Sequence, residues 1–204
     1  MKLDIIVAGV GGQGNLLASV ALANYAMNKG LEVFGTETIG AAQRGGSVVS
    51  HMRISDKKIY SPLVPQGKAD ILMGFEPIEA VRNIQFLSPK GKFIINNYPV
   101  PTILCNMGMD QYPTEEEILN HLRSRCPQGY VIDASKKATE MGSLMMTNVI
   151  MLGALAAVEP FFDKLELQRI IAELLPKKVL EQNLQAYEEG YKMVTAYAAE
   201  GCVC

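Results

Sequence analysis

Near its N-terminus the chain passes from an apolar run to a cluster of glycines, and then to a second apolar stretch that lacks Gly and Pro. Residues 3–9 are rich in β-branched side chains and predict a buried strand. Residues 13–29 predict a helix, and Lys29 followed by Gly30 is typical of a helix end. The glycines between them therefore form a tight strand-to-helix turn, whose backbone N–H groups can hold an anion.

A second strand is expected at residues 31–36, which would complete a βαβ unit with parallel strands and a right-handed crossover. Residues 37–46 show no regular period. Residues 47–54 alternate and predict a half-buried strand, with His51 and Arg53 on its polar face. The chain thus offers two loops, one after each of the first two strands, that we expect to lie side by side.

The remaining pattern predicts further strands at 70–75, 92–96 and 130–133, and helices at 77–87, 114–126, 135–141, 144–158, 165–175 and 178–198. Thr114 and Glu117 form a capping box at the start of the 114–126 helix. The prolines of 97–113 indicate a loop-rich connection with a short extended piece at 102–105. We therefore predict a three-layer, Rossmann-like α/β fold with a mostly parallel sheet. It would be one domain over residues 1–204, with an α/β core at 1–134 and a helical part at 135–204.

Composition excludes several partners. The net charge of −2 gives no electrostatic reason to expect binding to nucleic acid or to an anionic membrane. The most apolar later run, 144–158, is shorter than the roughly 20 residues that span a bilayer. The four cysteines include no closely spaced set for an iron–sulfur cluster, and we expect no metal site and a cytoplasmic location.

The glycine cluster fits the G-x-G-x-x-G pattern through Gly9, Gly11 and Gly14, with Gly12 and Gln13 in the variable positions and Asn15 next along the chain. Glu37 lies where a dinucleotide-binding protein keeps its ribose-binding acid. NAD or FAD binding is one interpretation. The other is that the glycines only allow a tight turn and close packing of helix on strand.

The loop after the second strand carries Arg44, Gly45 and Gly46, a guanidinium beside two flexible positions. Loops at the carboxyl ends of parallel strands line the ligand crevice, so this loop and the glycine cluster could face one space. A structural turn with an exposed Arg is the alternative. His51 and Arg53 could extend the same site, face a partner chain or be structural. The sequence shows no recognisable set of catalytic residues, such as a nucleophile motif, a metal-binding cluster or a carboxylate pair. This favours a subunit over a complete enzyme.

The sequence as a whole resembles the γ-type subunits or domains of the 2-oxoacid:ferredoxin oxidoreductases. The resemblance is carried by the glycine cluster and by the blocks Glu37–Ser55, Ser61–Pro65, Ala69–Ala80 and Asn148–Leu155. These blocks run through most of the chain, and Glu37–Ser55 is far more specific than the glycines. Within the family, the similarity is to the indolepyruvate branch.

The resemblance implies a subunit that supports oxidative decarboxylation of a 2-oxoacid, with formation of an acyl-CoA and reduction of ferredoxin. The substrates would be aryl pyruvates. Thiamine diphosphate and iron–sulfur clusters would belong to a large partner subunit, CoA would be a co-substrate, and this chain would carry no cofactor and be inactive alone. An isolated copy could self-associate. The pyruvate, 2-oxoisovalerate and 2-oxoglutarate enzymes use related subunits, and a free-standing NAD- or FAD-binding protein also stays open.

Overall fold

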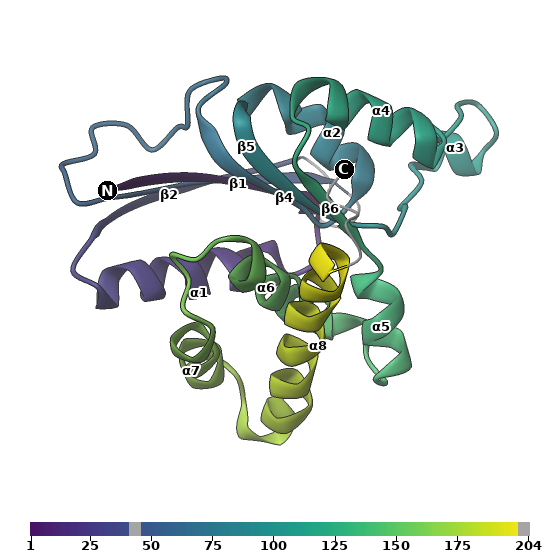
Figure 1. The fold of residues 1–204 in the computed structure, drawn as a ribbon. Helices are drawn as coiled ribbons and strands as arrows, with labels where there is room; N and C mark the ends of the chain where they lie inside the picture. The colour runs from purple at the N-terminus through teal and green to yellow at the C-terminus, as the bar shows by residue number, and fades with distance from the viewer. Residues whose placement is uncertain (41–45, 200–204) are drawn as a thin grey trace.

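A sheet of six strands lies between two layers of helices in the computed structural model, which describes residues 1–40 and 46–199, with side chains up to residue 196 (Figure 1). The strands are β1 (Lys2–Val10), β2 (Glu32–Ile39), β3 (Ser47–Ser55), β4 (Ala69–Gly74), β5 (Leu87–Asn96) and β6 (Gly129–Ile132). The helices are α1 (Asn15–Asn28), α2 (Pro77–Asn83), α3 (Ile103–Asn106), α4 (Glu115–Arg125), α5 (Ala134–Glu140), α6 (Thr147–Val158), α7 (Lys164–Leu174) and α8 (Leu180–Ala199). Short 3₁₀ turns occupy Ile84–Phe86, Leu144–Met146 and Lys177–Val179.

The strand order is β2-β3-β1-β4-β5-β6, and β3 alone among these strands runs against the others. The prediction of a mostly parallel, three-layer α/β fold is confirmed. The strands β1 and β2 point the same way, as expected, but β3 lies between them and pairs antiparallel with both. The connection from β2 to β3 is short, and a short connection can only return the chain antiparallel.

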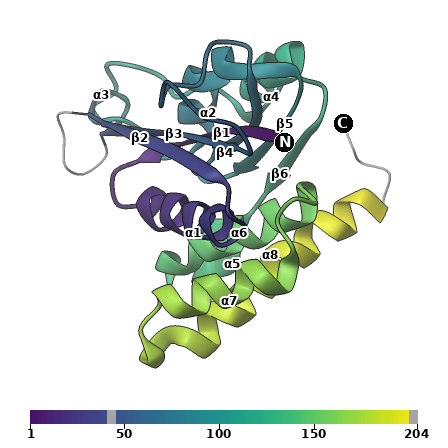
Figure 2. The same ribbon diagram turned by 90° about the vertical axis from the view of Figure 1, so that its left-hand side faces the viewer.

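Each face of the sheet is covered by its own set of helices and has its own hydrophobic core. Successive side chains of β1 alternate between them: Ile5 and Val7 pack toward α1 and α6, whereas Ile6 and Ala8 pack with the α2–α4 side. In Figure 1, α2 and α4 lie above the sheet, and α1, α5 and α6 lie below it. Figure 2 shows α7 and α8 in the outer part of the lower layer. The helices that follow β1 and β4 therefore lie on opposite faces.

The capping box at Thr114 and Glu117 is confirmed at the start of α4. The extended piece predicted at 102–105 is wrong, because the short helix α3 occupies this position. Its first turn is capped by Thr102, whose hydroxyl accepts a hydrogen bond from the N–H of Cys105 at 3.3 Å.

Candidate functional site

The site is built where β1 and β4 end side by side. These neighbouring parallel strands send their helices to opposite faces, and this reversal is the position where open α/β sheets hold ligands. A cavity of about 380 Å³ opens there. Its walls come from the glycine loop, from Tyr98 and Val100 after β5, and from the start of α6.

The glycine loop satisfies much of its own backbone. Gly12 and Gly14 have φ of 100° and 84°, in the left-handed region that favours glycine. The N–H of Val10 donates to Gln13 Oε1 at 2.9 Å, and the N–H of Gln13 donates to the carbonyl of Val10 at 3.2 Å. The N–H of Gly11 donates to the carbonyl of Gly46 at 2.9 Å. These donors hold the turn together and are not free to bind a ligand.

A chain of hydrogen bonds forms the base of the cavity. Gln13 Nε2 and Asn96 Nδ2 both donate to the carbonyl of Phe75, at 3.2 and 3.0 Å. Asn96 also donates to the Ser135 hydroxyl at 2.9 Å, which lies 3.2 Å from the Thr147 hydroxyl. These bonds join the ends of β4 and β5 to α5 and α6, so the polar base of the cavity is fixed by buried groups.

The start of α6 supplies an amide, Asn148, that is only partly hydrogen-bonded. Asn148 is 8% exposed, and its Oδ1 accepts a hydrogen bond from the N–H of Val149 at 2.8 Å. Its Nδ2 has no acceptor among the hydrogen bonds of the described residues, and it lies against Gly14 at the cavity wall. Within the same residues, no side chain caps the N-terminus of α1. Helix α6 continues from the 3₁₀ turn Leu144–Met146, which Ser143 caps by accepting a hydrogen bond from the N–H of Met145 at 3.3 Å. The uncapped start of α1 and the Asn148 amide N–H₂ make this end of the cavity suited to an anion.

The arrangement does not fit a dinucleotide held in the Rossmann manner. That mode needs the ribose-binding acid on the strand beside β1, but β3 occupies this place. Glu37 lies within β2, two strands away, and its Oε1 accepts a hydrogen bond from the Ser50 hydroxyl at 3.0 Å. Three backbone donors of the glycine turn are also bonded within the protein, as described above.

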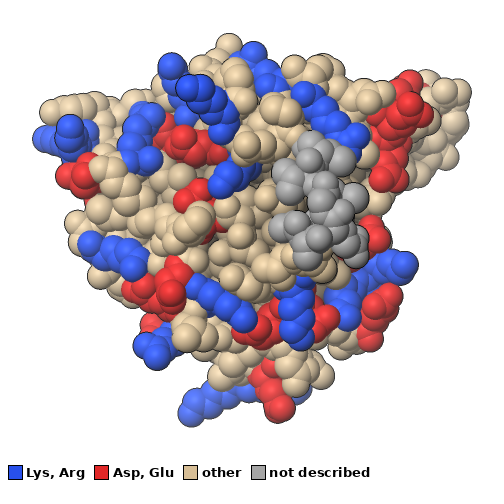
Figure 3. All heavy atoms as spheres, in the orientation of Figure 1, with Lys and Arg blue, Asp and Glu red and all other residues tan. Residues whose placement is uncertain are grey.

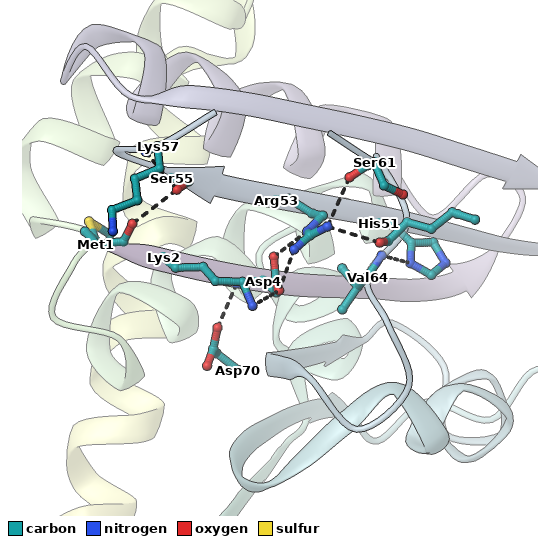
Figure 4. Close-up of polar contacts among 11 residues, drawn as sticks. Met1, Lys2, Asp4, His51, Arg53, Ser55, Lys57, Ser61, Val64 and Asp70 are labelled. Atoms are coloured by element: carbon teal, nitrogen blue, oxygen red, sulfur yellow. Dashed lines mark hydrogen bonds and ion pairs between the residues drawn. The ribbon is translucent and has the colours of Figure 1, made fainter. Parts of the chain in front are cut away.

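Arg53 and His51 hold the 56–65 connection onto the sheet (Figure 4). Neither residue lines the cavity. Arg53 Nε donates to the buried Asp4 at 2.9 Å, and its Nη1 donates to the carbonyl of Ser61 at 3.1 Å. His51 Nδ1 accepts a hydrogen bond from the N–H of Val64 at 3.2 Å, and burial lowers the pKa of the imidazole. These contacts give both side chains structural roles.

The other predicted site residues are placed as follows. Gly9 lies against the side chains of Gln13 and Asn15. A Cβ at this position would overlap both of them. Asn15 Nδ2 donates to the carbonyl of Val48 at 3.4 Å, so this amide ties the start of α1 to β3. Gly46 meets Gly11, whereas Arg44 and Gly45 lie outside the described residues. The structure thus brings one end of the second loop to the glycine loop, as the sequence predicts.

Several residues of this region were not predicted. Glu76 follows β4 and is buried, and it accepts hydrogen bonds from Tyr112 Oη at 2.5 Å and from the N–H of Val100 at 3.2 Å. Burial and the nearby carboxylate raise the pKa of Tyr112. Asn96, the last residue of β5, and Ser135, in the first turn of α5, were also missed. These residues and Glu76 share one signal, a polar residue at the end of an apolar strand or within three residues after it, because such positions lie at the carboxyl edge of a parallel sheet.

The described residues present a ligand-sized cavity at the switch point of an α/β sheet, where proteins of this fold class hold their ligands. The arrangement is that of a binding site. Residues 4–193 match the family model described as pyruvate ferredoxin/flavodoxin oxidoreductase. The chain belongs to this family.

Similar proteins indicate which enzymes of the family the chain is most like in sequence. The indolepyruvate oxidoreductase subunit IorB of Archaeoglobus fulgidus is 38% identical over 192 residues, which cover 94% of each chain. The 2-oxoglutarate synthase subunit KorC of Methanothermobacter thermautotrophicus is 26% identical, over 95% of this chain and 96% of that one. A solved 2-oxoglutarate:ferredoxin oxidoreductase from Magnetococcus marinus shares the fold, with a TM-score of 0.73 and 24% identity, over 96% of this chain and 31% of that chain.

Among the described residues, no group of three or more His, Cys, Asp or Glu side chains gathers as a metal site. No helix in the described part is both long enough and apolar enough to cross a membrane.

Proposed function

We propose that the chain is the non-cluster-bearing subunit of an aryl-pyruvate (indolepyruvate):ferredoxin oxidoreductase. The observation that carries this is its 38% identity to an indolepyruvate oxidoreductase subunit over 94% of both chains, against 26% to a 2-oxoglutarate synthase subunit. Thiamine diphosphate and iron–sulfur clusters belong, in this proposal, to a large partner subunit. CoA and ferredoxin are co-substrate and electron acceptor of the assembled enzyme. Residues 1–204 act as one unit in it.

The site that this chain contributes comprises Gly9, Gly11–Asn15 and, from their sequence position, Arg44–Gly46. The Gly11–Gly46 hydrogen bond and the adjacent cavity support this grouping. The role we propose for it is to bind and position an anionic group of a reactant or cofactor at the edge of the partner's reaction centre. Asn148 Nδ2 and the first turn of α1 are the groups able to donate hydrogen bonds there.

Reconstitution tests the function. The purified chain alone should neither reduce NAD nor oxidise a 2-oxoacid. Mixed with the large subunit, it should support CoA-dependent reduction of ferredoxin, with kcat/KM for indolepyruvate at least about tenfold above that for pyruvate or 2-oxoglutarate. A preference for 2-oxoglutarate would reassign the substrate. Turnover or stoichiometric NAD binding by the chain alone would overturn the subunit proposal.

Arg44→Ala tests the site. We expect the variant to fold and assemble normally, because a loop Arg contributes little to the core, but to lower turnover of the complex by roughly tenfold or more. Arg123→Ala, an exposed Arg on α4, is the matched control and should leave turnover unchanged. Wild-type turnover of a stable Arg44→Ala complex would remove this residue from the site.

A further inference from the structure

Strand β2 forms one edge of the sheet, with a row of backbone groups that faces outward. In the part of the chain that the structure describes, its eight residues pair with β3 alone and in an unbroken register. The register continues to Gly40, whose N–H donates to the carbonyl of Ser47 at 2.8 Å. Bonded residues alternate in an antiparallel ladder and Gly40 is one of them, so the N–H and C=O groups of the odd-numbered residues from Val33 to Ile39 point away from β3.

β2 lacks the features of sequence and register that normally protect an edge strand. Protected edge strands are short, or carry Lys, Pro or a bulge that prevents another strand from pairing. β6, at the opposite edge, has only four residues. β2 has eight, with no Lys, Pro or register shift, and it exposes the side chains of Phe34 and Ile39. A strand of this kind is a template for pairing with a further strand.

Helix α1 adds an apolar stripe beside the same edge. It packs beneath β2 and β3, as Figure 2 shows, and none of its residues is charged. By contrast, acidic and basic side chains are interspersed over the face that Figure 3 shows. Leu16, Val20 and Met27 of α1 are exposed, and their spacing of four and seven residues sets them on one side of the helix. We name these three side chains the α1 stripe.

The α1 stripe faces the β2 edge because other helices occupy the opposite side of α1. The Tyr25 hydroxyl donates to the carbonyl of Phe161 at 2.8 Å, and the Tyr25 ring packs against Phe161 and Phe162, just before α7. Successive residues of a helix are about 100° apart, so Met27 lies about 160° around the helix from Tyr25. α6 packs beneath β5, α8 packs beneath β6, and α7 packs on both helices. These helices lie on the β6 side of α1, so the stripe points to the side where β2 ends the sheet.

The sequence of β2 is complementary to itself. In an antiparallel pairing with Thr36 on a two-fold axis, Phe34 lies opposite Thr38 of a second copy, and Val33 lies opposite Ile39. Aromatic or β-branched side chains opposite β-branched ones stabilise antiparallel strands, as does the pair of threonines on the axis. The outward groups of the odd-numbered residues then bond to each other. Because opposite residues share a face of the sheet, both α1 helices lie on one face, with their stripes turned toward each other.

Charge favours this register and an identical partner. In this register Glu37 lies opposite Gly35 of the second copy, so no two carboxylates are opposed. An axis at Gly35 would instead place Val33 opposite Glu37, an apolar side chain against a carboxylate. The uncharged α1 stripe has no group to pair with a strongly acidic or basic partner, whereas an identical stripe covers it with apolar side chains.

We propose that β2 and the α1 stripe form the interface of a symmetric homodimer, in which two six-stranded sheets join edge to edge about Thr36. This inference is drawn from β2 and α1 alone and does not rest on the proposed function. The outcome of its tests therefore leaves the proposed function as it stands.

Disulfide trapping tests the register. Thr36→Cys and Thr38→Cys are made in the full chain, in a background that keeps only the buried Cys126 of the four cysteines. Across a non-hydrogen-bonded pair such as that on the axis, the Cα atoms lie about 4.5 Å apart, which a disulfide can span. The two copies of position 38 lie four residues apart along the strands, roughly 13 Å, which is too far. On mild oxidation with diamide, Thr36→Cys should form a covalent dimer at least about tenfold faster than Thr38→Cys. Equal or reversed rates would overturn the proposed pairing.

Lysine substitutions test the surface. Ile39→Lys and Met27→Lys place a charge on β2 and on the α1 stripe, and Leu165→Lys on α7 is the control, with wild-type exposed fractions of 65%, 53% and 60%. All three side chains are exposed, so circular dichroism and thermal melting should match the wild type. By sedimentation equilibrium, the first two variants should raise the dimer dissociation constant at least about tenfold, and the control should stay within about twofold of the wild type. A monomeric wild type would overturn the proposal. A dimer that neither surface variant weakens would place self-association on another face and would overturn it as well.

Discussion

At the scale of single residues, His51 shows how burial couples charge to stability. Its imidazole is buried against Phe86, and this burial lowers its pKa below the ordinary value of 6.5. Below about 6.5 the unfolded chain takes up a proton that the folded chain resists, so the free energy of unfolding falls as the pH drops. Above that pH the contribution of His51 is fully present. We therefore expect the wild type to lose stability between pH 7.5 and pH 5.5.

The variant His51→Asn isolates this effect, because an amide oxygen can still accept the hydrogen bond from Val64 but does not titrate. We expect it to cost about 1–2 kcal/mol at pH 7.5 through lost packing, and to depend less on pH. Urea unfolding at several pH values measures this. His121→Asn, an exposed His on α4, should keep the wild-type slope. Equal slopes for His51→Asn and the wild type would show that His51 does not carry the effect.

Gly14 combines a backbone requirement with a steric one. Its φ is 84°, and an added Cβ would overlap the amide of Asn148. Gly30 is the matched control, because its φ of 72° is also left-handed but nothing lies within 4 Å of its Cβ position. Gly30→Ala should cost about 1–2 kcal/mol for the conformation alone, and Gly14→Ala at least about 1 kcal/mol more. Equal losses in denaturant unfolding would mean that Asn148 moves aside freely.

At the scale of elements, the hydrophobic pattern predicts most of the structure because most helices and strands here bury one clear face. The prediction fails where the decisive contact is made by another part of the chain. The pairing partner of β1 is one example. The pattern of residues 47–54 predicts a strand, but it does not predict that this strand inserts between β1 and β2. Helix α3 is another, because its apolar residues are exposed and only the Thr102 cap marks its start.

The packing of α6 on α8 depends on two glycines whose role the sequence does not reveal. A Cβ on Gly153 would overlap the backbone of Tyr187, and a Cβ on Gly190 would overlap that of Ile150. Alanine is normally favoured over glycine in a helix by about 1 kcal/mol. Here we expect Gly153→Ala and Gly190→Ala each to destabilise the chain by about 2–3 kcal/mol in urea unfolding, because the two backbones must separate. Gln182→Ala on the exposed side of α8 should change stability by less than about 0.5 kcal/mol. Stabilised glycine variants would contradict the close crossing.

At the scale of the whole molecule, the glycine loop and Gly46 were predicted to be neighbours, but on the expectation that the first two strands are adjacent. They lie together because β3, which begins directly after Gly46, runs antiparallel beside β1, with Ser47 paired to Val10. The groups that join this region to α5 and α6 could not be predicted. Asn96, Ser135 and Asn148 come together only when the helical C-terminal part folds back beneath the sheet. His51 and Arg53 take the structural role that the sequence left open beside a site or an interface. The 56–65 connection covers them and uses their hydrogen bonds, which the strand pattern alone does not reveal.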